Sequence, residues 1–273
     1  MLVRSQTTML FLHPGADELN KGGILVIGSV RKACQIISCF SNEDPALGIG
    51  EIAGRLNMNI STAHHLVSTL CAEGVLMKDD RKKYRLGWRL LEWNNHVMFQ
   101  QDVYDKAMPL VKELIHRFRG TVHIAMFDKG TVVFVLKVSS QESTPVQTYI
   151  GSRKPAYATS SGKVLLSYNA VYLKETLERG LLGEAPNTIT DISRLKLELE
   201  EIRSQGYSIS NNENSDGMYG IAAPIFSYSE EIIAAVNLVA PVSYMLANDR
   251  KMMIQSVKNT AQAISKELGY IEV

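Results

Sequence analysis

The chain has few of the residues that metal sites and disulfides require. It contains three cysteines and six histidines in 273 residues, and none of them follows the spacing of a metal-ligand motif. Cys34, Cys39 and Cys71 all fall in segments that we expect to be helical. We therefore interpret them as small core residues of a protein in a reducing compartment, and we expect neither a metal nor a cofactor.

Long hydrophobic runs are also missing. The apolar patch at residues 9–12 is too short for the core of a signal peptide, and no run in the chain reaches membrane-spanning length. We expect residues 1–28 to be a leader without ordered structure. We also expect the protein to be cytoplasmic and to have no membrane partner.

The chain lacks a strong excess of either charge. Its formal net charge of +1 gives no global sign of a nucleic-acid partner. Residues 28–89, however, carry nine Lys and Arg against six Asp and Glu, whereas residues 107–273 carry seventeen of each. The modest basic excess therefore lies in the N-terminal part of the chain.

That part has the pattern of a winged helix-turn-helix within an expected domain over residues 29–89. A helix over residues 49–56 is followed by Asn57, which suits a turn that needs a left-handed backbone. A second helix begins near Asn59 or Ser61, either of which can cap it. Its core-facing positions have helical spacing: Ala63, Leu66, Val67 and Leu70.

The outer face of the second helix and the hairpin after it are the candidate DNA interface. A recognition helix enters the major groove, and a basic wing at residues 75–86 suits phosphates or a minor groove. The candidate residues are Ser61, Thr62, His64, His65, Ser68, Thr69, Lys78, Lys82, Lys83 and Arg85. Two alternatives stay open: a solvated charged hairpin, and a winged helix that mediates assembly without reading DNA.

Two helical segments flank this motif. Before it, Ser29 is the expected N-cap of a supporting helix whose apolar stripe comprises Val30, Ala33, Cys34, Ile37 and Phe40. After it, residues 90–118 are the expected linker or dimerisation helices, divided in two by Pro109. For the half after Pro109, ordinary core helices of a second domain are the alternative.

Residues 119–273 predict an antiparallel α+β sensor domain. Residues 122–127 and 131–138 form an expected hairpin, and further strands are expected at 220–226 and 232–240. Helices are expected at residues 160–168, 171–180, 193–205 and 247–268. Strands, inserted helices, further strands and a closing helix describe one packed sensor domain.

The chain resembles the IclR family of bacterial transcriptional regulators from about residue 28 onwards. Motifs that carry the resemblance lie at residues 52–53, 61–64, 84–87, 150–155, 158–166, 188–190 and 221–225, with Glu213 and Pro241. The resemblance implies a DNA-binding winged helix followed by a GAF-like domain that binds a small effector. It implies a homodimer or a dimer of dimers on double-stranded operator DNA, often repressing a catabolic operon in response to an organic, aromatic or sugar acid.

A carboxylate-bearing effector also has a physical rationale. Residues 159–162 lie where a loop enters a helix, and free N–H groups at a helix start favour an anion. A simple helix cap by Thr159 or Ser160 is the alternative. By position in the family motifs, the effector candidates are Val146, Ser160, Ser161, Ser210, Met218, Asn237 and Val239, of which the apolar three could equally be plain core.

Several positions depart from the family pattern. His65 stands where Arg is usual, and the loss of Arg removes the best bidentate contact to guanine; His65 as a surface residue is the alternative. Tyr157 replaces a common His, as in relatives that sense sugar acids. Gly162 and Lys163 lack the preceding glycine spacing of a phosphate loop. An enzyme is the rival class, but no nucleophile–His–carboxylate set stands out, so we expect no catalysis.

Overall fold

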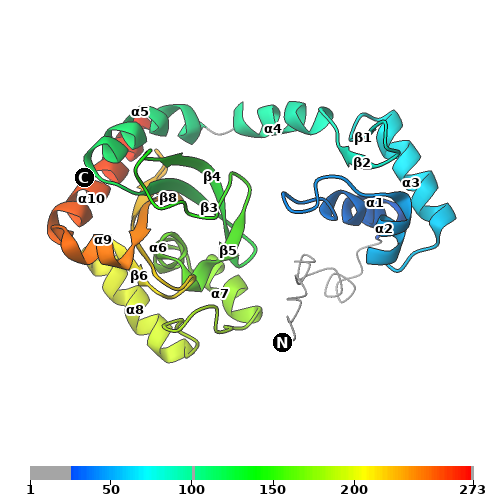
Figure 1. Ribbon diagram of the computed structural model, residues 1–273. Helices are drawn as coiled ribbons and strands as arrows, with labels where there is room; N and C mark the ends of the chain where they lie inside the picture. Colours follow the sequence, from blue (N-terminus) through cyan, green and yellow to red (C-terminus); the bar gives the residue numbers. More distant parts are fainter. Residues whose placement is uncertain (1–25, 100–101, 272–273) are drawn as a thin grey trace, which may run out of the picture. The chain divides into compact units, whose positions relative to one another are not determined.

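The computed structural model describes residues 26–99 and 102–271, so nearly all of the expected leader lies outside the described residues. The chain divides into two compact units, one ending at Val97 and the other beginning at Met98 (Figure 1). Among the described residues, no helix is long and apolar enough to cross a membrane.

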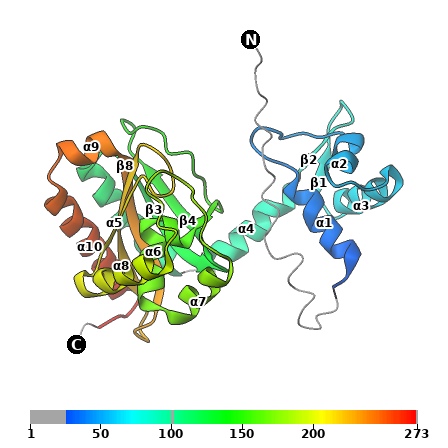
Figure 2. The ribbon, with the colours of Figure 1, turned by 90° about the horizontal axis from the view of Figure 1, so that it is seen from below.

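The first unit is a winged helix-turn-helix, as expected. Leu47 pairs with Tyr84 in an isolated antiparallel bridge, which adds a short third segment to the hairpin. Figure 2 shows the helices of residues 49–55 and 60–72 side by side, with the hairpin next to them. The elements are α1 (Gly28–Ser38), α2 (Ile49–Arg55), α3 (Ile60–Ala72), β1 (Leu76–Lys78), β2 (Tyr84–Leu86) and, at the exit, α4 (Arg89–Phe99).

Local chemistry explains the turn of this motif. Asn57 has a φ of 47°, the left-handed conformation that Asn tolerates better than most residues. The Gly48 N–H donates to a Glu51 carboxylate oxygen at 2.6 Å, which satisfies a free donor at the start of α2. The expected cap of α3 is wrong in part, because Asn59 holds the N-cap position without a side-chain hydrogen bond.

The expected stripe on α1 is wrong in part. The helix begins at Gly28 after an Ile27 N-cap, so Ser29 does not cap it. Val30 and Cys34 are exposed, whereas Ile36 and Cys39 are buried. Ala33, Ile37 and Phe40 of the expected stripe pack against the core, so the stripe is confirmed in the later part of the helix and wrong at Val30 and Cys34.

The segment between the two units differs from expectation at Pro109. This proline lies inside α5 (Asp102–Arg117) and does not divide it. A proline removes one helical hydrogen bond, but the apolar face of α5 is held in the core of the second unit by buried Val103, Ala107, Val111 and Leu114. The interpretation as core therefore fits the half after Pro109. By contrast, α4 exposes Leu91, Trp93 and Val97.

The second unit is built on one antiparallel sheet of six strands in the order β5-β4-β3-β8-β7-β6. The β3–β4 hairpin turns through Lys129 and Gly130, whose φ values of 49° and 76° suit a two-residue hairpin turn. The strands are β3 (Thr121–Asp128), β4 (Thr131–Ser139), β5 (Arg153–Pro155), β6 (Ser208–Asn211), β7 (Met218–Phe226) and β8 (Ile232–Pro241).

Helices cover both faces of this sheet. One core contains α5 and α10 residues with sheet residues such as Val122 and Ile124, and the other contains α6 and α8 residues with Phe134 and Ala222. Figure 2 shows α10 and α7 on opposite sides of the strands. The helices are η2 (Ala156–Ala158), α6 (Ser160–Tyr168), α7 (Ala170–Glu178), α8 (Ile192–Gln205), α9 (Val242–Ala247) and α10 (Arg250–Glu267).

Candidate functional site

The outer face of α3 presents the polar residues that the sequence singles out. Ser61, His64, His65, Ser68 and Thr69 are exposed and Thr62 is half-buried, while Ala63, Val67 and Leu70 face the core. The Thr69 hydroxyl donates to the His65 carbonyl oxygen at 3.0 Å. The face is therefore polar, unobstructed within its own unit and compatible with a groove of DNA.

The wing turn is organised by one aspartate. A carboxylate oxygen of Asp79 accepts from the N–H groups of Arg81 and Lys83, both at 2.9 Å. Lys82 has a φ of 61° at the tip. Because Asp79 is used inside the turn, the cations remain on the outside: Lys78, Lys82, Lys83 and Arg85 are exposed. Lys83 also forms an exposed ion pair with Glu51 at 3.5 Å.

The second unit contains a cavity of about 370 Å³ between the sheet, the start of α6 and the loop over residues 145–148. Six of the seven effector candidates line it: Val146, Ser160, Ser210, Met218, Asn237 and Val239. Ser161 does not line it. Its hydroxyl oxygen instead lies behind the wall and accepts from the Asn237 side-chain amide at 3.3 Å.

The cavity favours an anion at one end. Thr159 caps α6 by accepting from the Gly162 N–H at 3.1 Å, which leaves the N–H groups of Ser160 and Ser161 for another acceptor. Lys154 contributes a cation to the lining and forms no ion pair within the described part of the chain. The lining contains no Asp or Glu, so nothing acidic opposes a carboxylate there.

The back wall of the cavity is a buried histidine. His123 Nδ1 lies 3.0 Å from the Asn237 side-chain oxygen, which also accepts from the His123 N–H at 3.2 Å. Nδ1 is therefore the donor, and Nε2 accepts from the Thr148 hydroxyl at 2.8 Å. Burial lowers the pKa of His123 to about 4, against the effect of its bond to Asn237. The imidazole is thus neutral near pH 7.

A partly buried lysine fixes the loop that covers the same cavity. Lys137 Nζ donates to the carbonyl oxygens of Val146 and Thr148, at 2.9 Å and 2.5 Å. Burial lowers the pKa of Lys137 from its ordinary value. The Thr148 hydroxyl also bonds to His123. Lys137 on β4 and His123 on β3 therefore both hold the loop to the sheet.

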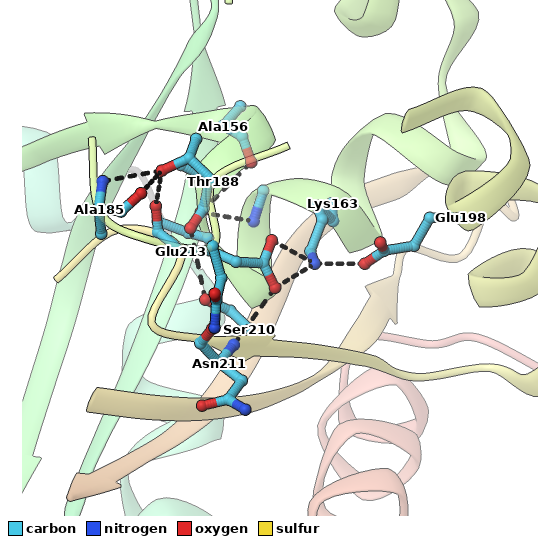
Figure 3. A network of polar contacts seen from close by, with 12 residues as sticks. Ala156, Lys163, Ala185, Thr188, Glu198, Ser210, Asn211 and Glu213 are labelled. Atoms are coloured by element: carbon cyan, nitrogen blue, oxygen red, sulfur yellow. Dashed lines mark hydrogen bonds and ion pairs between the residues drawn. The ribbon is translucent and has the colours of Figure 1, made fainter. Parts of the chain in front are cut away.

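A buried lysine joins α6 to the connection between β6 and β7 (Figure 3). Lys163 is completely buried, and its Nζ contacts both Glu213 carboxylate oxygens, at 2.8 Å and 2.7 Å, as well as Glu198. Burial raises the pKa of Glu213 despite the neighbouring ammonium. Lys163 points into this cluster and away from the cavity, in keeping with the rejection of a phosphate loop.

Comparison with known proteins agrees with both units. The profile of the IclR helix-turn-helix domain matches residues 29–80, and the profile of the bacterial transcriptional regulator IclR C-terminal domain matches residues 95–266. The chain belongs to the IclR family. It is therefore a DNA-binding transcription regulator whose C-terminal unit has the effector-binding fold of that family.

Individual relatives extend over almost the whole chain. The HTH-type transcriptional regulator XynR of Escherichia coli (strain K12) is 30% identical over 252 residues, 90% of this chain and 98% of XynR. The crystal structure of the Thermotoga maritima IclR aligns with a TM-score of 0.71 at 29% identity, covering 89% of this chain and 99% of that one. An IclR homolog from Microbacterium hydrocarbonoxydans complexed with 4-hydroxybenzoate aligns with a TM-score of 0.79 at 26% identity, covering 88% and 98%.

Within this IclR-family fold, sequence reasoning missed part of the cavity. His123, Phe134, Thr148 and Lys154 all line it. The first three sit in ordinary strand or loop patterns that carry no local signal, and Lys154 lies in the motif at residues 150–155 but was not singled out. Tyr157 does not line it. Its hydroxyl group instead accepts from the Leu182 N–H at 2.8 Å and donates to the Leu182 carbonyl at 2.9 Å, which supports a loop.

We predict that Lys163→Met destabilises the second unit by about 3–5 kcal/mol, because it leaves the buried Glu213 carboxylate without its cation. Adding Glu213→Leu to that variant should restore part of the loss. Lys174→Met is the matched control, since Lys174 forms an exposed pair with Glu178 at 4.0 Å and should change stability by less than about 0.5 kcal/mol. Urea unfolding measures all three; equal effects of the two lysine variants would contradict the assignment.

The lowered pKa of His123 predicts a pH-dependent stability. An unfolded histidine has a pKa near 6.5, so between about pH 6.5 and 4 the unfolded chain binds a proton that the folded chain excludes. The free energy of unfolding therefore falls as pH falls through this window, by about 2.5 kcal/mol at pH 4.5. His123→Gln should lack this part of the loss in urea unfolding at pH 7 and 4.5. A parallel decline in both proteins would show that His123 is not responsible.

Proposed function

We propose that this regulator represses a catabolic operon. We further propose that a small organic acid, bound in the cavity of the second unit, modulates its affinity for the operator DNA. The observation that carries the proposal is the composition of the cavity: Lys154, the N-terminus of α6 and no acidic side chain. The same chain carries a winged helix-turn-helix, so ligand and DNA are bound by one molecule.

The size and lining of the cavity support a small carboxylate. A volume of about 370 Å³ lies at the low end of the range for ligand sites. Ser160, Ser210 and Asn237 offer polar groups to a substituted acid, and Val146 with Met218 offers apolar contact. The relative from Microbacterium hydrocarbonoxydans binds 4-hydroxybenzoate, which is a carboxylate of this size. An aromatic or a sugar acid would satisfy these groups.

On the DNA side, the proposal assigns the exposed face of α3 to base edges and the wing to phosphates. The domains are residues 29–89 for DNA, 90–118 for the linker or dimer helices and 119–273 for the effector, in a cytoplasmic protein. The apolar residues exposed on α4, Leu91, Trp93 and Val97, support a homodimer, which can itself pair into a dimer of dimers. Such a dimer reads two half-sites about one helical turn apart.

Regulation requires that the acid bind two arrangements of the protein with different affinities. The first experiment is a mobility-shift titration on DNA upstream of the chain's own gene and its neighbours, with and without a panel of acids that includes 4-hydroxybenzoate. We expect one fragment to bind in the presence of competitor DNA, and one acid to change that binding. An absence of specific binding under all of these conditions would overturn the proposal.

Lys154→Gln tests the anion end of the cavity. It removes one charge-assisted contact, so about tenfold more acid should be needed for the same change in DNA binding. DNA affinity without acid should stay unchanged. Lys174→Gln, which removes an exposed lysine on α7, should respond as the parent does. A Lys154→Gln protein that responds at the parental acid concentration would disprove this role.

The wing makes a separate prediction about salt. Each phosphate contact contributes about 0.9 to the slope of log affinity against log salt. Replacing Lys82 and Lys83 with Gln should therefore reduce the slope by about 1.8 without changing which fragment is preferred. A mobility shift at four salt concentrations measures it, with Lys174→Gln as the control. An unchanged slope would show that the wing does not contact phosphates.

A further inference from the structure

A second cavity of about 340 Å³ lies between the C-terminal end of α8 and α10, with β7 as its floor. We call it the α8–α10 groove. Its lining shares no residue with the effector cavity. The end of α6 and residue 270 complete it, so four segments that are distant in sequence converge on it.

Two cations in the α8–α10 groove have unused hydrogen-bonding capacity. The Arg203 guanidinium donates no hydrogen bond to the described part of the chain, and it lies 6.0 Å from the centre of the Tyr168 ring. Lys258 Nζ donates once, to the Gln205 carbonyl oxygen at 2.8 Å, which leaves two of its three N–H bonds free. Among the described residues, the lining contains no Asp or Glu, so it favours an anion.

An aromatic cluster forms the other part of the groove. The rings of Tyr168 and Phe226 meet edge to face with centres 5.2 Å apart, and Phe226 and Tyr270 stack at 5.2 Å. All three line the groove and are only partly buried. Such rings favour another aromatic ring by offset or edge contact.

We propose that the α8–α10 groove is a second binding site, which takes a small aromatic carboxylate. The carboxylate is held by Arg203 and by the free N–H bonds of Lys258, a pairing in which Arg can bind both oxygens at once. The ring of the ligand lies against Tyr168 and Phe226. A cationic ligand is repelled by the two basic groups, and a ligand without a ring leaves the aromatic cluster without a partner.

The position of the groove gives this site a route to the rest of the second unit. One wall is α10, which packs against α5 and is tied to it by an ion pair between Lys106 and Glu267 at 3.7 Å. Figure 1 shows these two helices side by side. A ligand in the groove therefore contacts α10. The neighbour of α10 is α5, the first helix of the second unit along the chain from the DNA-binding unit.

Methyl NMR of the full chain, labelled at Ala and Met methyl groups, distinguishes the two sites during a titration with benzoate. Ala223 and Ala261 line the groove and Met218 lines the effector cavity. We expect saturable shifts of Ala223 and Ala261 methyl signals. Arg203→Gln should weaken them about tenfold and leave any Met218 shift unchanged, and Lys258→Gln should act in the same direction. Lys251→Gln, an exposed lysine of α10, is the control and should bind as the parent does.

Unmoved Ala223 and Ala261 signals would overturn the second site, as would shifts that never saturate or that survive in both Arg203→Gln and Lys258→Gln. Saturable shifts at the two alanines without one at Met218 would support the groove, and would count against benzoate as an effector in the cavity. One experiment therefore tests the two sites separately: the Ala223 and Ala261 signals report on the groove, and the Met218 signal reports on the effector cavity.

Discussion

A buried ion pair holds together the part of the molecule on which the candidate ligand site depends. Removing a lysine from water costs several kcal/mol unless its charge is paired, and Lys163 is completely buried. Glu213 meets it with both carboxylate oxygens. Because Lys163 is on α6 and Glu213 on the connection before β7, their attraction fixes the start of α6 against the loop that supplies Asn214 and Ser215 to the cavity.

The start of α6 is also closely packed. Residues 160–167 are all buried, and a Cβ at Gly162 would lie 2.0 Å from the Ala156 carbonyl oxygen, so only glycine allows the helix to start here. At Gly220 a Cβ would lie 2.7 Å from the Ser160 hydroxyl oxygen. Glycines on two elements thus allow α6 to start in close contact with η2 and β7, while neutral His123 adds no charge to the cavity wall.

Sequence patterns predicted the elements whose signals are local. The bounds of α6, the β3–β4 hairpin and both helices of the DNA-binding motif follow from periodicity, turn residues and motif spacing. The cavity wall could not be predicted in the same way, because His123 and Asn237 are 114 residues apart and no local pattern pairs them. Strands β5 and β6 were missed since they have three and four residues. Pro109 was misinterpreted because tertiary packing outweighs a local breaker.

The alternation of β3 explains how a ligand can influence distant parts of the chain. Successive side chains of a strand point to opposite faces, so His123 faces the cavity while Val122 and Ile124 lie in the core that contains Val111 and Leu114 of α5. In the proposed coupling, a ligand that breaks the hydrogen bond between the Thr148 hydroxyl and His123 acts on this strand. Its other face packs against the helix nearest the DNA-binding unit in sequence.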